Sequence, residues 1–318
     1  MNEPFQDEIL IEVVRGAMVE SIHHGRLLIV DGSGEDLLAL GGVDQLIYPR
    51  SAIKSIQASA MVRAGLALEA RDLALVCASH AGSAMHQESA LRILASAGLS
   101  EKTLRNTPDK PLGLVERREW GDREATSLAA NCSGKHAGMV ATSANNGWDL
   151  ATYKDVSHPL QTLIRKEFED LAAEKITAVS VDGCGAPLFA MTLRGMVRAI
   201  HQITHSDDPV HREVVSACTT YPEMVSGKGR VVTDAMARVP GLLVKDGAEG
   251  VMIASFRGKG TVAWKMSDGS NRGDRPLLSA SLSHLDIALE FERIPVYGDG
   301  KVVGEIRASK LLADVASR

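Results

Sequence analysis

A serine and a lysine stand three residues apart in the segment Ser51-Ala52-Ile53-Lys54. If this segment is helical, the spacing puts the hydroxyl and the amine on one face, where a neutral lysine could accept the serine proton. A lysine becomes neutral near pH 7 only if burial or a nearby positive charge lowers its pKa. The pattern arises readily by chance, so taken alone it favours a solvated helix face over a catalytic pair.

A second group of reactive side chains includes two cysteines. Cys132, Lys135 and His136 fall within one turn of a predicted helix, and Cys184 lies in a glycine-rich segment after a predicted strand. Two thiols and an imidazole are donors that suit zinc, although buried structural cysteines are the commoner explanation. The segment is not a phosphate-binding loop, because Ala129 stands where the first glycine of that motif belongs and His136 replaces its Ser/Thr.

A third candidate is Ser79, which follows the apolar run 73–78. We expect that run to form a buried strand, and the carboxyl ends of such strands present side chains to a cleft. Neighbouring side chains of a strand point to opposite faces, so only one of Ser79 and His80 could serve a given site. A capping serine before the next helix is an equally good interpretation.

Several familiar catalytic templates are missing from the sequence. Neither Gly32-Ser33-Gly34 nor Gly183-Cys184-Gly185 is followed by the third glycine of a dinucleotide fingerprint. The sequence also contains no Gly-x-Ser-x-Gly elbow and no His-Glu-x-x-His helix.

The elements that would position these side chains alternate between helix and strand. Residues 8–48 predict a β-meander with strands over 9–14, 17–22 and 26–30, and a helix follows from Ser51 to a stop at Gly65. The remaining pattern predicts helices over 87–97, 132–144 and 157–175 and strands over 176–181, 250–256 and 261–265. We find no repeat and no linker, and therefore expect one α/β domain over residues 1–318.

Composition narrows the class of protein. The 318 residues are 45% hydrophobic and 24% charged, with a net charge of -5 and only 5 Phe, 4 Tyr and 3 Trp, which disfavours disorder and a nucleic-acid partner. The acidic start, Met1 to Glu8, does not resemble a signal peptide, and no apolar run is long enough for a membrane span. Four scattered cysteines do not form a disulfide framework, and Cys77 and Cys218 are expected to fill the core. We expect a cytoplasmic protein.

Five blocks of sequence, taken together, resemble the L-asparaginase II family, the Rhizobium-type asparaginases. The resemblance implies a fold similar to serine β-lactamases and penicillin-binding proteins, with an antiparallel sheet flanked by helices. It also implies a homodimer that hydrolyses L-asparagine to L-aspartate and ammonia. The blocks span residues 48–57, 77–80, 131–138, 182–187 and 264–270.

The resemblance also implies site residues. The two Ser-Lys pairs of the family match Ser51 with Lys54 and Ser79 with Lys265. Its zinc ligands match Cys132, Lys135 and Cys184, and Asp182 matches an acidic residue beside the metal. One position departs from the family pattern, because Ser83 stands where the family usually has a glutamate.

These assignments give a mechanism to test. Ser51 would attack the side-chain amide after Lys54 takes its proton, and Ser79 with Lys265 would pass a proton to the departing ammonia. Arg50 is a candidate for the substrate α-carboxylate or for a structural salt bridge. His136 and Asp182 are further candidates for contacting the substrate.

Two other functions stay open on the sequence alone. A β-lactamase-like hydrolase shares Ser-x-x-Lys, but the chain has no Lys-Thr-Gly triplet. A catalytically impaired amino-acid sensor or a redox-sensitive zinc protein would use the same cysteines, and Ser83 keeps that alternative open.

Overall fold

The framework of the molecule is an antiparallel sheet, seen in a computed structural model that describes residues 5–313. Within those residues the strand order of the large sheet is β11-β12-β1-β2-β10-β9-β8, and β3 pairs with β2. Residues 1–4, on which part of the signal-peptide argument rests, lie outside the described range. The strands are β1 (Glu8–Arg15), β2 (Met18–Asp31), β3 (Asp36–Leu40), β8 (Leu243–Gly247), β9 (Val251–Phe256), β10 (Gly260–Met266), β11 (Ile294–Gly298) and β12 (Lys301–Ala308).

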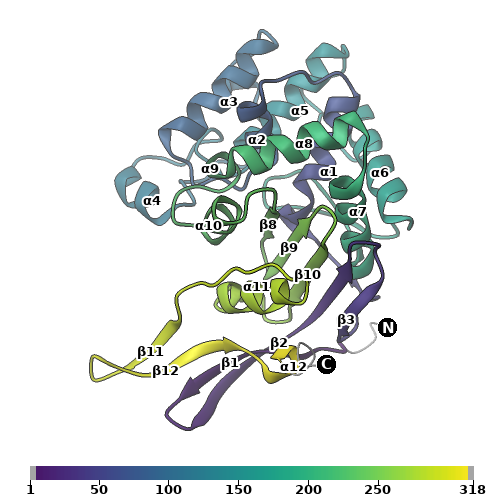
Figure 1. Cartoon of the computed structure of the whole chain (residues 1–318). Helices are drawn as coiled ribbons and strands as arrows, with labels where there is room; N and C mark the ends of the chain where they lie inside the picture. The colour runs from purple at the N-terminus through teal and green to yellow at the C-terminus, as the bar shows by residue number, and fades with distance from the viewer. Residues whose placement is uncertain (1–4, 314–318) are drawn as a thin grey trace.

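Helices cover one end of this sheet and form most of the opposite half of the molecule (Figure 1). Helix α7 packs directly on β10, β9 and β2. The helices are η1 (Arg50–Ile53), α1 (Lys54–Arg63), α2 (Ala70–Val76), α3 (Ala84–Ser96), η2 (Glu101–Thr103), α4 (Leu114–Trp120), α5 (Ser133–Asn145), α6 (Pro159–Ala172), α7 (Leu193–His205), α8 (Pro209–Thr220), α9 (Pro222–Val225), α10 (Val231–Arg238), α11 (Asp274–Ser283) and α12 (Lys310–Ala313). Short strands β4 (Leu46–Ile47), β5 (Val179–Val181), β6 (Pro187–Phe189) and β7 (Met191–Thr192) make two small ribbons.

The prediction of one α/β domain with an antiparallel sheet flanked by helices is confirmed. Its boundaries at residues 1 and 318 stay a prediction. The helices expected from Ser51, over 87–97, over 132–144 and over 157–175 are present, as is the hairpin of β9 and β10. The strand expected over 176–181 is reduced to β5.

Two of the predicted strands are one continuous strand. The break expected between the strands over 17–22 and 26–30, at residues 23–25, lies inside β2, whose residues pair first with β1 and then with β10. Gly25 is needed here for close packing, because a Cβ at this position would lie 2.6 Å from the backbone oxygen of Lys265. A glycine in a strand often marks such an approach rather than a turn.

The buried strand expected over 73–78 is wrong, because residues 70–76 form helix α2. A short apolar run does not distinguish a buried strand from a buried helix. The first turn of α2 carries Asp72, whose carboxylate accepts hydrogen bonds from Arg92 and Ser89 of α3. Contacts of α2 with α8 and α5 bury the apolar residues that follow.

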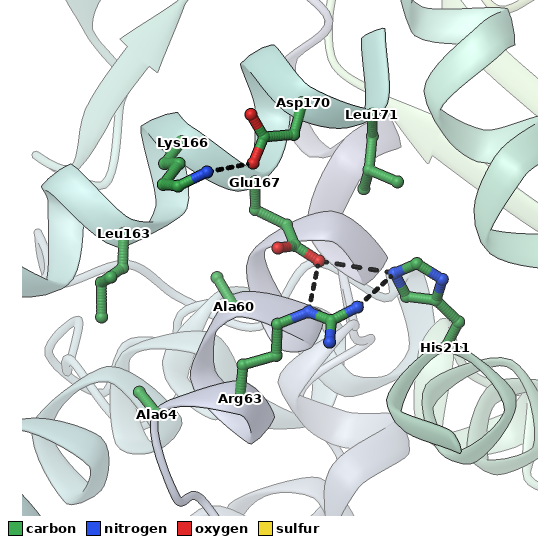
Figure 2. Close-up of a pocket in the computed structure, with 9 residues that line it drawn as sticks. All are labelled: Ala60, Arg63, Ala64, Leu163, Lys166, Glu167, Asp170, Leu171 and His211. Carbon is green, nitrogen blue, oxygen red and sulfur yellow. Dashed lines mark hydrogen bonds and ion pairs between the residues drawn. The ribbon is translucent and has the colours of Figure 1, made fainter. Parts of the chain in front are cut away.

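Helices α1, α6 and α8 are tied together by ion pairs at the surface (Figure 2). The Glu167 carboxylate accepts hydrogen bonds from Ser59 Oγ at 2.6 Å and Arg63 Nε at 3.1 Å. His211 Nε2 lies 3.4 Å from the same carboxylate oxygen.

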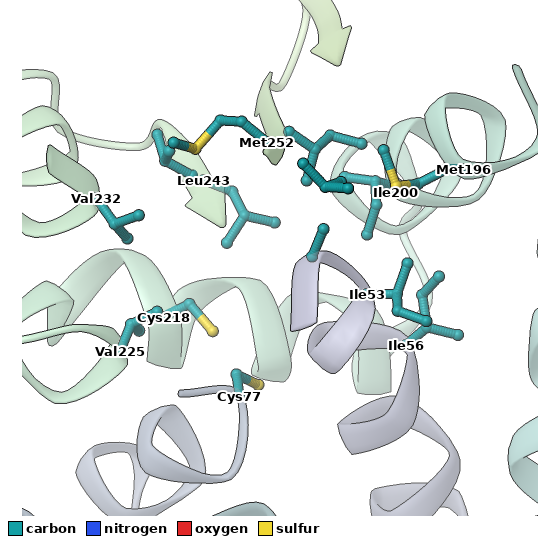
Figure 3. Packing of buried hydrophobic residues seen from close by; sticks show 14 of the residues in the cluster. Ile53, Ile56, Cys77, Met196, Ile200, Cys218, Val225, Val232, Leu243 and Met252 are labelled. Atoms are coloured by element: carbon teal, nitrogen blue, oxygen red, sulfur yellow. The ribbon is translucent and has the colours of Figure 1, made fainter. Parts of the chain in front are cut away.

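The main core joins the helices to the sheet and contains both remaining cysteines. Figure 3 shows Cys77 and Cys218 among buried apolar side chains, and each is 1% exposed. The prediction that these two thiols fill the core is confirmed. No helix in the described residues is long and apolar enough to cross a membrane.

Candidate active site

Ser51 lies on a short helical turn that leads into α1. The turn η1 begins at Arg50, whose φ of 52° lies in the left-handed region that non-glycine residues rarely occupy. Such backbone strain is characteristic of functional sites. Ser51 lines a cavity of about 300 Å³, while Lys54 one turn later is 2% exposed.

The Lys54 amine reaches a second serine. Lys54 Nζ donates to the backbone oxygen of Ala78 and lies 3.3 Å from Ser79 Oγ. No hydrogen bond joins Lys54 to Ser51 within the described part of the chain. The Ser-x-x-Lys segment is therefore buried at its lysine, which excludes the solvated helix face.

The amine that flanks Ser79 on its other side is that of Lys245, not of Lys265. Lys245 Nζ donates to Ser79 Oγ at 3.0 Å. Lys265 Nζ instead donates to the backbone oxygens of Glu249 at 2.7 Å and Met266 at 2.6 Å. The predicted pairing of Ser79 with Lys265 is thus corrected: Lys245, on strand β8, occupies the place expected for Lys265.

A sequence signal for Lys245 was present but incomplete. The strand β8 carries Lys245-Asp246-Gly247, which differs from Lys-Thr-Gly only in its middle residue. A search for the full triplet rejects it. The residue that replaces threonine is an acid, and it contacts Lys245 directly.

The two lysines that contact Ser79 differ in their electrostatic surroundings. Burial, with the nearby charges of Lys135 and Lys245, lowers the pKa of Lys54 from 10.5 to about 7. Burial also lowers the pKa of Lys245, but the Asp246 carboxylate opposes that effect. Lys54 is therefore the amine that can act as a base near neutral pH.

A cluster of buried sulfur and nitrogen atoms lies next to these serines, at the start of α5. The donor atoms of Cys132, His136 and Cys184 all lie within 4.8 Å of one another. Lys135 Nζ lies 3.2 Å from Cys184 Sγ. The predicted ligands Cys132, Lys135 and Cys184 therefore lie together, and His136 joins them.

His136 belongs to this cluster and not to the cavity that Ser51 lines. Its side chain is fully buried, and its Nδ1 pairs with the Tyr153 hydroxyl at 2.7 Å. The other ring nitrogen, Nε2, is buried without a hydrogen-bond partner. His136, a candidate from the sequence for contacting the substrate, therefore lies among the donor atoms and does not line this cavity, and its contact with a substrate stays a prediction.

The electrostatics of the cluster favour a thiolate. A hydrogen bond from Cys132, with the charge of Lys135, lowers the pKa of Cys184 despite its burial. The hydrogen bond to Cys184 and burial raise the pKa of Cys132. Burial lowers the pKa of His136 to about 4, so its ring is neutral at pH 7. One thiolate, a second thiol and an unpartnered neutral imidazole nitrogen fit the donor set of a zinc ion.

The cavity contains one ion pair at its wall. Arg50 Nε and Asp182 Oδ1 are 2.9 Å apart, and both side chains are partly exposed. The same cavity is lined by Ser51, Cys132 and Cys184. The predicted substrate-contacting residues Arg50 and Asp182 thus meet beside Ser51, as a salt bridge in this structure.

Ser83 and His80 lie away from this cavity. Ser83 is the N-cap of α3, and its Oγ is 2.7 Å from His86 Nδ1. Ser83 lines a different cavity, together with Pro111 and Trp120. His80 is fully buried, with Nε2 at 2.9 Å from Ser133 Oγ. Ser83 itself therefore does not line the cavity that Ser51 lines.

Comparison with known proteins gives one strong similarity. The family model described as L-asparaginase II matches residues 11–308. No curated protein matches the chain.

Similar solved structures share little sequence with the chain. A protein assigned as a β-lactamase from Bacteroides dorei is 13% identical, with a TM-score of 0.46 over 83% of this chain and 93% of its own. A β-lactamase from Mycobacterium bovis is 12% identical, with a TM-score of 0.44 over 83% of this chain and 95% of its own. The structure called Mglu in its native form is 12% identical, with a TM-score of 0.45 over 86% of this chain and 66% of its own.

Proposed function

The chain belongs to the L-asparaginase II family, and from that premise we propose that it hydrolyses L-asparagine to L-aspartate and ammonia. The observation that carries the proposal is the contact of two buried lysine amines with one serine hydroxyl, beside a cavity that Ser51 lines. Hydrolysis of an amide needs a nucleophile, a base and a proton donor for the leaving nitrogen. Ser79 and the two lysines that contact it, Lys54 and Lys245, supply these groups together with Ser51.

Ser51 is the nucleophile in this proposal, because it borders the cavity whereas Ser79 is only 4% exposed. Neutral Lys54 has two N–H groups and one lone pair. Its two N–H groups match the oxygens of Ala78 and Ser79, which leaves the lone pair for the Ser51 proton. Ser51 Oγ then forms a bond to the amide carbon, and a tetrahedral intermediate results.

Ser79 passes the second proton. Its oxygen has two lone pairs and one O–H. Lys54 and Lys245 occupy the lone pairs, so the O–H remains to protonate the departing nitrogen while Lys245 gives its own proton to Ser79. The C–N bond breaks, ammonia leaves, and water hydrolyses the β-aspartyl ester on Ser51. The proton taken up by Lys54 then returns through Ser79 to Lys245, which balances the cycle.

The ion pair of Arg50 and Asp182 suits the other end of the substrate. L-asparagine carries an α-carboxylate and an α-ammonium group. A guanidinium binds the first and a carboxylate the second, so one substrate could exchange contacts with both side chains. Binding would therefore replace a partly exposed salt bridge with two charge-assisted contacts.

The proposed cofactor is zinc, held by Cys132, Cys184 and nitrogen from His136 or Lys135. A bound zinc ion supplies a fixed divalent charge and Lewis acidity beside the cavity. Lys135 of α5 also contacts the loop of Cys184, at 3.2 Å from Cys184 Sγ.

Substitution of a proposed ligand tests the assignment of the zinc site. We expect Cys184→Ser to lower zinc affinity by at least about 10²-fold, because a neutral hydroxyl replaces a thiolate. Zinc content measured by mass spectrometry of metals in purified protein should fall well below one ion per chain. Cys218→Ser, which changes a cysteine outside the cluster, should keep its zinc. Equal zinc in both variants would exclude the proposed donor set.

The pH dependence of the rate tests the role of Lys54. Because the pKa of Lys54 is lowered to about 7, the neutral base predominates above pH 7 and is lost below it. We expect kcat/KM to fall about tenfold per pH unit below that value. Initial rates of ammonia release between pH 5 and pH 8 measure this limb. A rate that is flat across the range would show that Lys54 is not the base.

The activity itself is tested by ammonia release from L-asparagine, measured beside L-glutamine with the zinc-loaded protein. Release from L-asparagine supports the proposal, and release from L-glutamine alone would replace its substrate. Release from neither amide by folded protein would favour an amino-acid-binding role.

We also propose that the chain forms a homodimer in the cytoplasm. Family membership supports the dimer, and the free, scattered cysteines support a reducing compartment. Light scattering of the purified protein measures its oligomeric state.

A further inference from the structure

Asp246 follows Lys245 on strand β8 and contacts its amine. We propose that Asp246 is a positioning residue that keeps Lys245 protonated and directed at Ser79, so that the two lysines beside Ser79 have opposite proton roles. This inference rests on the proposed function only for the assignment of Lys245 as the proton donor. The contact itself is independent of what the site hydrolyses.

The hydrogen-bond partners of Lys245 match an ammonium group. An ammonium has three N–H donors and no acceptor. Lys245 Nζ has three oxygen partners: Ser79 Oγ at 3.0 Å, the backbone oxygen of Asp246 at 2.7 Å, and the Asp246 carboxylate. Lys54 has only two partners among the described residues, which matches a neutral amine. The geometry thus assigns a different charge to each lysine.

The carboxylate of Asp246 is itself held in place from its other side. Arg230 donates to Asp246 Oδ2 at 3.0 Å and to Ser226 Oγ at 2.7 Å. The segment that Arg230 reaches also holds the backbone of Ser79, since Ser79 N donates to the Val225 oxygen at 3.0 Å. Asp246 therefore connects the strand of Lys245 to the loop that positions Ser79.

The charges around Lys245 leave Asp246 as its one anionic partner among the described residues. Arg230 before α10 is a cationic neighbour that disfavours a charged Lys245, and Lys54 at the start of α1 does so only when it carries a proton. The thiols of Cys77, which follows α2, and of Cys218 from α8 also face it. Strand β9 brings no titratable side chain, and Arg50 of η1 is paired with Asp182.

Asp246 is ionised over the range in which the site works. Burial opposes its ionisation, but Lys245 and Arg230 lower the pKa of Asp246 to about 2. Asp274 of α11 also faces Asp246 and carries a carboxyl whose pKa burial raises to about 7. Neutralising Asp246 should therefore remove the main force that keeps a proton on a buried lysine.

The test is a titration of Lys245 by NMR in protein with ¹³C-labelled lysines, its signal being identified as the one lost in Lys245→Arg. We expect Asp246→Asn to lower the titration midpoint of Lys245 by about one to three pH units, as for the loss of an opposite charge in contact. Asp246→Glu, which keeps the charge, should restore most of the shift. The alkaline limb of kcat should move in the same direction while KM changes little.

Glu167→Gln is the matched control, since Glu167 is also a partly buried carboxylate bound by an arginine (Figure 2). It should leave the midpoint of Lys245 unchanged. If Asp246→Asn does not fold, the wild-type protein still tests the proposal, because the Lys245 signal must titrate well above that of Lys54, which is identified as the signal lost in Lys54→Met. An unchanged midpoint in Asp246→Asn, or a wild-type midpoint of Lys245 at or below that of Lys54, would overturn it. The NMR result is informative even if L-asparagine is not hydrolysed, so it separates this inference from the proposed function.

Discussion

Ser51→Ala is expected to reduce ammonia release from L-asparagine by about 10⁴-fold or more, because it removes the nucleophile. The fold should be retained, since the Ser51 side chain faces the cavity and no hydrogen bond of its hydroxyl holds other described residues in place. The measurement is the rate of ammonia release at pH 8, together with the far-UV circular dichroism of the same sample.

A trapping experiment shows whether the loss is chemical. Hydroxylamine attacks an ester on Ser51 in place of water and yields aspartyl hydroxamate. With hydroxylamine present, the wild-type protein should therefore make both ammonia and aspartyl hydroxamate. Ser51→Ala should make neither. Ser59→Ala is the control from the same helical segment, because its hydroxyl contacts Glu167 on the far side of α1. Hydroxamate from Ser51→Ala would assign the nucleophile elsewhere, and Ser79 would be the next candidate.

The sequence predicted which residues lie in the site better than it predicted which of them contact one another. Ser51, Lys54, Ser79 and the cysteines lie where the motifs indicated, because each belongs to a short segment with its own spacing. The partner of Ser79 was assigned to Lys265 instead of Lys245, although both lysines lie on strands of one sheet. Which of two lysines reaches a serine depends on the register and face of its strand, and one sequence does not determine these.

The fold errors have a similar cause. Gly25 suggested a turn, but its lack of a side chain serves the close approach of β10 to β2. The run before Ser79 is apolar enough for a strand, yet contacts of α2 with other helices, chiefly α8 and α5, stabilise a helix there. In both places a tertiary contact decides between two conformations that the local pattern leaves open.

Lys54→Met should have a large effect on activity and an opposite effect on stability. Methionine is unbranched like lysine and one atom shorter, but it cannot accept a proton, so we expect kcat to fall by about 10²–10⁴-fold. The substitution also removes a fully buried amine whose charged form is costly. The measurements are the rate of ammonia release and the free energy of unfolding in urea for both proteins.

The pH dependence of that stability change has a definite sign. The unfolded lysine has a pKa of 10.5 and the folded one a pKa of about 7, so the fold binds fewer protons between these values. The amine therefore destabilises the fold fully below pH 7, and this cost fades as the pH rises toward 10.5. The loss of the contacts with Ala78 and Ser79 offsets part of the gain.

We therefore expect Lys54→Met to raise the free energy of unfolding by about 1–3 kcal/mol more at pH 6 than at pH 10. Lys166→Met, which removes an exposed lysine paired with Asp170, should show no comparable pH dependence. If Lys54→Met were inactive but less stable at pH 6, Lys54 would be a structural ammonium instead of a base. Activity lost together with stability gained would mean that the fold tolerates this amine because the reaction requires it.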